Sequence, residues 1–177
     1  VYKIHSKPLR PERLMSSINK FIKDDAVIST DVATATVWST RYLNHGVNNK
    51  FIISSWLGTI GCSLPATIAS NIDYPNRQAI AIAGGGAFQM VMQDFATAVQ
   101  YDLPLTVFVL NNKQLAFIKY EQQASGELEY AVDFSDMDHA KFAEAAGVKG
   151  YTIKSASEVD AIVEEALAQD VPTIVDV

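Results

Sequence analysis

Apolar residues recur along the chain with two spacings, one typical of helices and one typical of buried strands. Residues 11–22 begin with a proline that fits the first turn of a helix. Four apolar residues fall on one face of that helix: Leu14, Ile18, Phe21 and Ile22. Residues 105–110, LTVFVL, are continuously apolar and rich in β-branched side chains, which is typical of a central parallel strand.

The two patterns alternate along the rest of the chain. Further strands are predicted at residues 26–30, 51–54, 78–83 and 173–177. Further helices are predicted at 31–43, 64–72, 88–101, 139–146 and 157–169, with an irregular stretch over 111–138. This alternation predicts an α/β fold, a doubly wound parallel sheet with helices on both faces. Residues 1–10, with Pro8 near their end, are expected to be a linker, and residues 11–177 a single domain.

Composition narrows the class of protein. The chain has 177 residues, 49% of them hydrophobic, which is enough to bury a core, and no run of eighteen apolar residues that would predict a membrane span. A net charge of −6 without a basic stripe argues against nucleic acid as a partner. The only cysteine is Cys62, so no disulfide framework is possible and a cytoplasmic location is expected. We expect Cys62 to be a small core residue rather than a reactive thiol.

The two ends of the sequence predict a fragment of a longer chain. The first residue is Val1 rather than methionine, and the last residues, VPTIVDV, stop within an apolar, strand-like run. The start also lacks the apolar segment of a secretory signal peptide.

Three predicted strands end in residues that could carry chemistry, because ligands of doubly wound sheets bind at the carboxyl ends of strands. Asp31 follows the first strand and is expected to cap the next helix, with a ligand contact as the alternative. Residues 84–86 are three glycines that join a predicted strand to a predicted helix. At such a turn the backbone can approach a phosphate closely. Asn111 and Asn112 either form a turn or offer an amide oxygen to a cation such as Mg²⁺.

The glycine turn, followed 26 positions later by the Asn-Asn turn, resembles the signature of thiamine diphosphate enzymes, which begins with Gly-Asp-Gly and closes on Asn. Around it, nearly the whole chain resembles the C-terminal cofactor-binding domain of pyruvate oxidases of the lactic-acid-bacterial type. Four stretches carry this resemblance: TATVWSTRYL at 34–43, NNKFIISSWLGTIGCSLP at 48–65, MVMQDFATAVQYDLPLTVFVLNNKQLAFIKYEQ at 90–122 and YAVDFSDMDHAKFAEAAG at 130–147.

The resemblance implies which residues would hold the phosphates and the metal. The turn of Gly84, Gly85 and Gly86 would lie at the diphosphate. Asn112 would give Mg²⁺ a side-chain oxygen, and Gln114 would give it a backbone carbonyl.

The resemblance also implies which residues would surround the rings of the cofactor. The carbonyl of Gly58 would accept a hydrogen bond from the aminopyrimidine, and Ile60 would be the apolar wedge that bends the cofactor. Four residues would line the substrate side of the thiazolium: Val32, Phe117, Ile118 and Glu121. By spacing alone, Ile60, Phe117 and Ile118 would be interpreted as core residues, and Glu121 as a solvated helix charge.

The chain departs from the family pattern around the cofactor. Gly85 stands where the family has the aspartate that binds Mg²⁺, so metal binding should weaken and cofactor affinity with it. Asp94 is no substitute, because it lies two turns into the helix and belongs to the family's own pattern. Ala33, Ser63 and Ala66 stand where the family has glycine, and each added Cβ crowds close-packed backbone or excludes positive φ.

For the whole enzyme, the resemblance implies oxidative decarboxylation of pyruvate with phosphate and O₂, giving acetyl phosphate, CO₂ and H₂O₂. It implies FAD as a further cofactor and a homo-oligomeric assembly. The family's activating glutamate and its FAD-binding domain lie outside the matching region, so we expect this chain to be inactive alone. Two alternatives stay open: a domain of another thiamine enzyme such as acetolactate synthase, which SSWLGT and residues 113–122 disfavour, or a degenerate non-catalytic module, which Gly85 supports.

Overall fold

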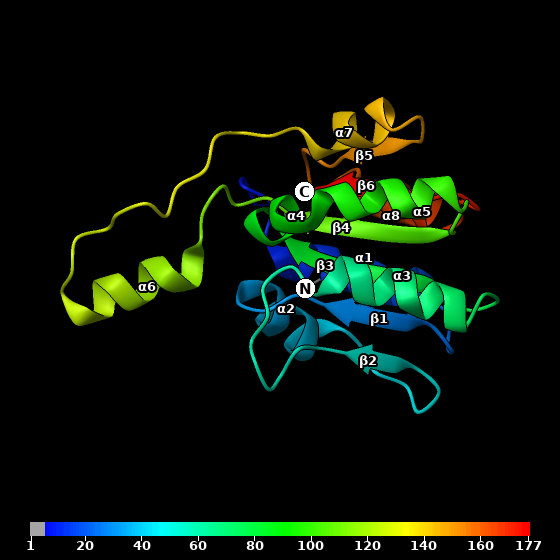
Figure 1. Cartoon of the computed structure of the whole chain (residues 1–177), viewed down its shortest axis with the longest axis horizontal. Helices are drawn as coiled ribbons and strands as arrows, with labels where there is room; N and C mark the ends of the chain where they lie inside the picture. The colour runs from blue at the N-terminus through cyan, green and yellow to red at the C-terminus, as the bar shows by residue number, and fades with distance from the viewer. Residues whose placement is uncertain (1–5) are drawn as a thin grey trace.

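The computed structural model describes residues 6–177, which form one six-stranded sheet with every neighbouring pair parallel (Figure 1). The strand order is β2-β1-β3-β4-β6-β5. The strands are β1 (Val27–Thr30), β2 (Lys50–Ile52), β3 (Ala79–Gly84), β4 (Leu105–Leu110), β5 (Gly150–Thr152) and β6 (Thr173–Asp176). The predicted fold class, a doubly wound parallel α/β sheet, is confirmed.

Helices cover both faces of the sheet, as the alternating pattern predicts. The helices are α1 (Pro11–Phe21), α2 (Thr34–Tyr42), α3 (Ser63–Asp73), α4 (Gly85–Val91), α5 (Phe95–Gln100), α6 (Ala116–Ser125), α7 (His139–Ala145) and α8 (Val159–Leu167). Of the predicted linker, residues 1–5 lie outside the described residues, and residues 6–10 form no helix or strand. No helix within residues 6–177 is long and apolar enough to cross a membrane.

The core has two layers because side chains alternate across the sheet. In β3, Ile80 and Ile82 pack with α1, α2 and α8, whereas Ala79, Ala81 and Ala83 pack with α3, α4, α5 and α7. The alanines leave room on their side for Phe88 and Phe95, which are both completely buried. Burial on both faces explains why the central strands are apolar throughout.

The predicted helix over residues 88–101 is wrong in its bounds and in its continuity. Helix α4 begins at Gly85, and a 3₁₀ turn at Met92–Asp94 separates it from α5. Of the three glycines, Gly86 is the one whose missing side chain this first turn needs, because an added Cβ would lie 2.5 Å from Cε2 of Phe134. The break occurs at Val91 (φ −133°, ψ 11°), whose side chain packs against Gly61 in the loop before α3.

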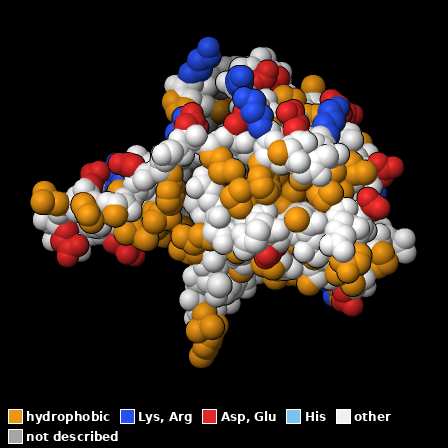
Figure 2. All heavy atoms as spheres, turned by 45° about the horizontal axis from the view of Figure 1, so that its top comes forward, with side chains coloured by type: hydrophobic (Ala, Val, Ile, Leu, Met, Phe, Trp, Pro, Cys, Tyr) orange, Lys and Arg blue, Asp and Glu red, His pale blue; other side chains and the backbone are white. Residues whose placement is uncertain are grey.

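The stretch 111–138, expected to be irregular, contains α6 and projects from the body as an arm (Figure 1). Two hydrogen bonds close the base of the arm, from Leu115 N to Val132 O (2.8 Å) and from Phe134 N to Lys113 O (2.8 Å). Hydrophobic side chains lie on the surface of the arm (Figure 2). They include five large exposed residues: Phe117, Ile118, Tyr120, Leu128 and Tyr130. The helix escaped prediction because only Ala116 of its residues is buried, so no apolar stripe marks it.

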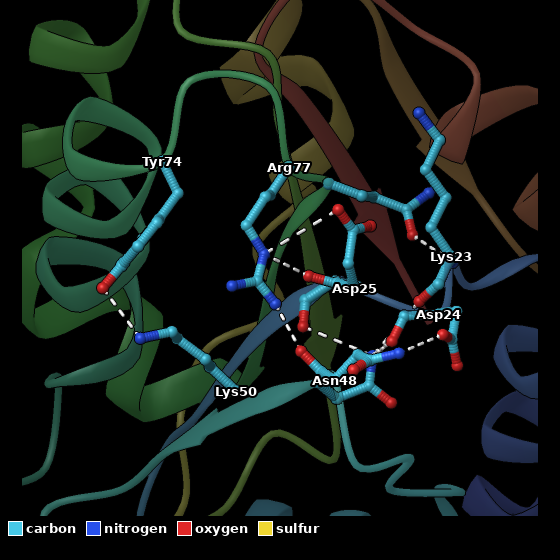
Figure 3. A network of polar contacts seen from close by, with 10 residues as sticks. Lys23, Asp24, Asp25, Asn48, Lys50, Tyr74 and Arg77 are labelled. Atoms are coloured by element: carbon cyan, nitrogen blue, oxygen red, sulfur yellow. Dashed lines mark hydrogen bonds and ion pairs between the residues drawn. The ribbon is translucent and has the colours of Figure 1, made fainter.

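A network of polar contacts joins the loops at the amino ends of the strands (Figure 3). The candidate site residues follow the carboxyl ends, on the opposite side of the sheet. Arg77 donates to the backbone carbonyls of Asp25 and Asn48, and Asn48 Nδ2 donates to Asp24 Oδ2 at 2.6 Å. Lys50 Nζ donates to the Tyr74 hydroxyl at 2.8 Å. These contacts therefore join the loops before β1, β2 and β3 at the amino ends of the strands. The candidate site residues lie at the opposite, carboxyl ends.

Candidate functional site

A cavity of about 60 Å³ lies at the carboxyl ends of β1, β3 and β4. It brings together eight of the residues predicted to form the site: Val32, Ile60, Gly84, Gly86, Asn112, Gln114, Phe117 and Ile118. Small-molecule sites usually enclose about 300–1,000 Å³, so this chain alone forms only part of the wall of such a site. The cavity also includes residues that sequence reasoning did not single out, among them Thr34, Leu115 and Ala116. Leu115 and Ala116 lie between the predicted residues Gln114 and Phe117, and Thr34 lies two positions after Val32, but no motif marks them.

The glycine turn passes from β3 to α4, and its three residues differ in what surrounds them. A Cβ added at Gly84, which lines the cavity, would meet no protein atom within 4 Å. One added at Gly85 would lie 3.1 Å from Asn111 Oδ1, and one at Gly86 would lie 2.5 Å from Cε2 of Phe134. Packing therefore requires glycine at 86, whereas glycine at 84 keeps the cavity open to a ligand. Gly85 itself is buried and is not part of the cavity wall.

The Asn-Asn turn shows the geometry of a tight turn. Asn112 Oδ1 accepts a hydrogen bond from Gln114 N (3.1 Å), and Lys113 between them has a left-handed backbone, φ +58°. Asn111 Nδ2 donates to the carbonyl of Met137 (3.1 Å), which anchors the returning segment of the arm. The turn interpretation of this pair therefore describes its conformation, and both Asn112 and Gln114 line the cavity.

The residues present fit a diphosphate better than they fit its metal. The open backbone at Gly84 leaves space for a phosphate group against the turn. The cavity-lining residues include amide and carbonyl oxygens but no carboxylate. Within residues 6–177, no cluster of three or more His, Cys, Asp or Glu side chains could hold a metal ion. Because Mg²⁺ in proteins usually has one or two carboxylate ligands besides phosphates, this site offers it a weak set of donors.

The end of β1 holds the one predicted residue whose role the structure changes. Asp31 does not cap α2, whose N-cap is Ala33 without a side-chain hydrogen bond, and it does not line the cavity. Its carboxylate is completely buried and turns toward the loop before α3, where it accepts hydrogen bonds from Gly61 and Ser63. The expectation of a cap on the following helix is therefore wrong, because the carboxylate binds the start of α3 instead.

Ala33, one of the residues that replace a family glycine, has φ +71° and ψ −135°. This is a backbone conformation that an L-residue with a Cβ adopts at a cost of about 1–3 kcal/mol. The strain predicted for this position is present, at a residue that lines the cavity.

Gly58 and Ile60 belong to the loop that joins β2 to α3. Gly58 has φ +59°, and a Cβ built on it would lie 4.0 Å from Val32 Cγ1, at the border of the cavity. Its amide donates to Ser54 O (3.1 Å), which forms a turn within the loop. Ile60 lines the cavity, whereas Gly58 does not, although it neighbours a residue that does.

Helix α6 of the arm contributes two of its three predicted residues. Phe117 and Ile118 line the cavity near the base of α6 and remain 40% and 39% exposed. Glu121, one turn further along α6, is exposed and does not line the cavity. Within this chain, Glu121 therefore stands apart from the other predicted residues.

Cys62 follows Gly61 and is half-buried. Its thiol makes a long contact of 3.7 Å with the carbonyl of Thr30. Burial, with the nearby charge of Asp31, raises the pKa of the Cys62 thiol, which keeps it protonated at neutral pH.

Comparisons with known proteins agree with this geometry. Residues 31–177 match the family model described as thiamine pyrophosphate enzyme, C-terminal TPP binding domain; thiamine pyrophosphate is another name for thiamine diphosphate. The chain is 47% identical over 170 residues to YdaP of Bacillus subtilis, a protein provisionally described as thiamine pyrophosphate-containing. That match covers 96% of this chain and 30% of the relative.

Two enzymes with established names are also similar. Pyruvate oxidase of Lactiplantibacillus plantarum is 33% identical over 172 residues, covering 96% of this chain and 28% of the enzyme. The large subunit of acetolactate synthase of Porphyra purpurea is 31% identical over 175 residues, covering 97% of this chain and 29% of the subunit. The chain thus spans less than a third of the length of the curated relatives it matches.

Proposed function

Because the chain belongs to the thiamine pyrophosphate enzymes and forms their C-terminal cofactor-binding domain, we propose that it binds thiamine diphosphate as part of an enzyme of the pyruvate oxidase type. One observation carries the proposal. The glycine turn after β3 and the Asn-Asn turn after β4, far apart in sequence, meet at one cavity that also holds Val32 and Ile60.

Each side of the cavity would have its own part in binding. The backbone at Gly84 and Gly86 would receive the diphosphate, and Asn112 with Gln114 would provide the protein's oxygens for Mg²⁺. Ile60 and Gly58 would lie against the aminopyrimidine. When bound, the cofactor supplies a nucleophilic carbon for attack on the carbonyl of a 2-keto acid, while the protein binds and orients it.

The substrate side of the site would be formed by Val32, Phe117, Ile118 and Glu121. Three of these side chains are apolar, so they would exclude water from a small keto acid. Glu121 would reach the substrate only when the exposed arm is brought against the rest of an assembled enzyme.

Pyruvate oxidase is preferred over acetolactate synthase on two stretches of sequence. These are SSWLGT at 54–59 and the segment from Lys113 to Gln122. In the whole protein, the substrates would be pyruvate, phosphate and O₂, with FAD as a second cofactor and a homo-oligomer as the assembly. Assay of the full-length protein with pyruvate separates the two enzymes: the oxidase forms acetyl phosphate and H₂O₂, and the synthase forms acetolactate.

A degenerate, non-catalytic module is the second candidate, and Gly85 is the observation that favours it. The two candidates differ in whether the cavity still receives thiamine diphosphate. In either case this chain alone should not turn over pyruvate, because the family's activating glutamate is supplied by another domain.

Ligand-observed NMR with millimolar thiamine diphosphate and Mg²⁺ tests binding directly. Saturation transfer from the protein to the pyrimidine and thiazolium protons is expected with the unmodified chain. The matched control is Gly84→Val, because a Cβ there meets no protein atom within 4 Å and the valine side chain would occupy the space left for the phosphate. The control should fold normally and lose the transfer. Absence of transfer with the unmodified chain, or equal transfer with Gly84→Val, would contradict the proposal.

A further inference from the structure

Asp31 is a completely buried carboxylate in the part of the molecule where the site residues converge. A charge removed from water requires several hydrogen-bond donors to remain stable. Three of its four donors come from Gly61 and Ser63, which follow Gly58 and Ile60 along the chain.

Four donors, all neutral, surround the carboxylate. Oδ1 accepts from Val32 N at 3.0 Å and from Gly61 N at 2.8 Å. Oδ2 accepts from Ser63 N at 3.3 Å and from Ser63 Oγ at 2.9 Å. The side chain thus joins the end of β1 to both sides of Cys62 in the loop.

The backbone of Asp31 is fixed as firmly as its side chain. Its amide donates to Ile82 O of β3 at 2.8 Å, and its carbonyl accepts from Thr36 Oγ1 of α2 at 2.6 Å. The carboxylate is therefore held between two strands and a helix of the body. The loop has hydrogen bonds of its own, such as Gly58 N to Ser54 O (3.1 Å) and Thr59 N to Ser54 Oγ (3.2 Å), but these lie within the loop. The bonds that Gly61 and Ser63 donate to Asp31 join the loop to the body, together with the longer contact of Cys62 Sγ with Thr30 O (3.7 Å).

Ile60 lies directly before Gly61 and lines the cavity, and Val32 lies directly after Asp31 and lines it too. A single side chain thus sets the separation between two walls of the cavity. The glycine turn after β3 is not among its partners.

We propose that Asp31 is a positioning residue for the ring-binding wall of the cavity, the wall formed by Ile60 and Val32. It acts through the amides of Gly61 and Ser63 and leaves the diphosphate turn unaffected. The Ser63 hydroxyl, at a position where a glycine is usual in the family, adds a fourth bond to this arrangement. The inference rests on the proposed function only in assigning the ring of the cofactor to this wall.

The first test separates ring binding from phosphate binding. Affinities for Mg²⁺–thiamine diphosphate and for Mg²⁺–pyrophosphate are measured by NMR titration of Asp31→Asn, Ser63→Ala and the control Ser29→Ala. Ser29 lies on the same strand, is buried, and its hydroxyl has no partner among the described residues. Asp31→Asn should weaken thiamine diphosphate at least tenfold and Ser63→Ala about threefold, while pyrophosphate changes less than twofold in both. Equal weakening of both ligands, or of neither, would overturn the inference.

The second test needs no ligand. In Asp31→Asn, the amides of Gly61 and Ser63 should exchange with deuterium at least tenfold faster, while the amide of Ile80 in β3 keeps its rate. Unchanged exchange at Gly61 and Ser63 would refute the positioning role even if the cofactor binds. Failure of thiamine diphosphate to bind the unmodified chain would instead contradict the proposed function, and the exchange result would still decide the role of Asp31 in the loop.

Discussion

The two strand ends that border the cavity use opposite means to shape it. At the end of β1, a buried carboxylate accepts four hydrogen bonds, and Ala33 adopts a backbone conformation suited to glycine. At the end of β3, three glycines turn into α4 without a polar side chain, and none of them has positive φ.

The difference shows that neither strand end offers a free carboxylate to a bound metal ion. Asp31 lies close to the cavity, but neutral donors of the protein already occupy both of its oxygens. Gly85 lies beside the cavity and brings no charge. Hydrogen bonds within the protein therefore shape the β1 end. The β3 end is shaped by the missing side chains of its glycines, which leave room for a phosphate group but offer no carboxylate to a metal ion.

Removing the Asp31 carboxylate should destabilise the protein, because the hydrogen bonds at the end of β1 would be lost. Asp31→Ala would leave three amides and a hydroxyl without their acceptor in a buried place, so we expect a loss of about 3 kcal/mol in unfolding free energy. Urea denaturation measures this value, with Ser29→Ala as the control, expected within about 0.5 kcal/mol of the unmodified chain. A loss of less than about 1 kcal/mol would show that the four bonds are not what holds this end.

A second carboxylate, that of Asp160, lies far from the cavity and differs from Asp31 because its partners include cations. Asp160 of α8 accepts from Arg13 (2.8 Å), Lys20 (2.6 Å) and Ser17 (2.6 Å) of α1. Side-chain hydrogen bonds, that of Arg13 first, hold the pKa of Asp160 well below its usual range. Because Asp160 is 36% exposed, solvent reduces the effect, and Asp160→Asn should cost about 2 kcal/mol.

The lowered pKa of Asp160 also gives the sign of a pH effect. The stabilisation is present above the ordinary aspartate pKa of about 3.9 and is lost as the pH falls through the lower pKa of the folded state. Thermal unfolding of the unmodified chain should therefore lose more stability between about pH 4 and pH 2 than that of Asp160→Asn. Thiamine diphosphate binding should be the same in both. Parallel acid curves for the two proteins would refute this account of the ion pair.

Relieving the strain at the β1 end should stabilise the protein. Ala33→Gly removes the cost of φ +71° and adds flexibility to the unfolded chain, for a net gain of about 1 kcal/mol. Ala35→Gly, two residues later in α2 and completely buried, is the matched control and should lose about 1 kcal/mol. The midpoints of urea unfolding compare the two variants, and destabilisation by both would mean that Ala33 is not strained.

A small side chain at the β3 end should change stability least. At Gly85→Ala, a better helix former offsets a contact of 3.1 Å with Asn111 Oδ1, so the unfolding free energy should change by less than about 0.5 kcal/mol. The same urea experiment measures it. A loss above about 2 kcal/mol would mean that Gly85 is required by packing.

Much of the fold can be predicted from the sequence, because buried side chains recur along the chain with the spacings of strands and helices. The strands around Ile80 and Val107 and the helix containing Leu14 follow from apolar spacing, and the strand order places their ends together. Eight predicted site residues therefore meet at one cavity, although their roles toward a cofactor stay predictions.

What the sequence does not reveal depends on contacts between distant segments. Asp31 looks like a cap for the residues that follow it, yet its partners are Gly61 and Ser63, thirty positions away, which local spacing cannot show. Helix α6 lacks an apolar stripe because it packs on little of the protein, so burial leaves no pattern to detect. The placement of Glu121 depends on the same arm, whose position relative to the body no local pattern encodes.

Calorimetric titration of thiamine diphosphate, with and without Mg²⁺, tests the central claim that this site keeps its shape but lacks the charged ligand of the metal. It compares the unmodified chain with Gly85→Asp and with Gly85→Ala, which adds the Cβ alone. The account predicts that Gly85→Asp binds at least tenfold more tightly in Mg²⁺, about 1.4 kcal/mol, that the gain disappears without Mg²⁺, and that Gly85→Ala shows no gain. Tight, Mg²⁺-dependent binding by the unmodified chain, equal to that of Gly85→Asp, would contradict it.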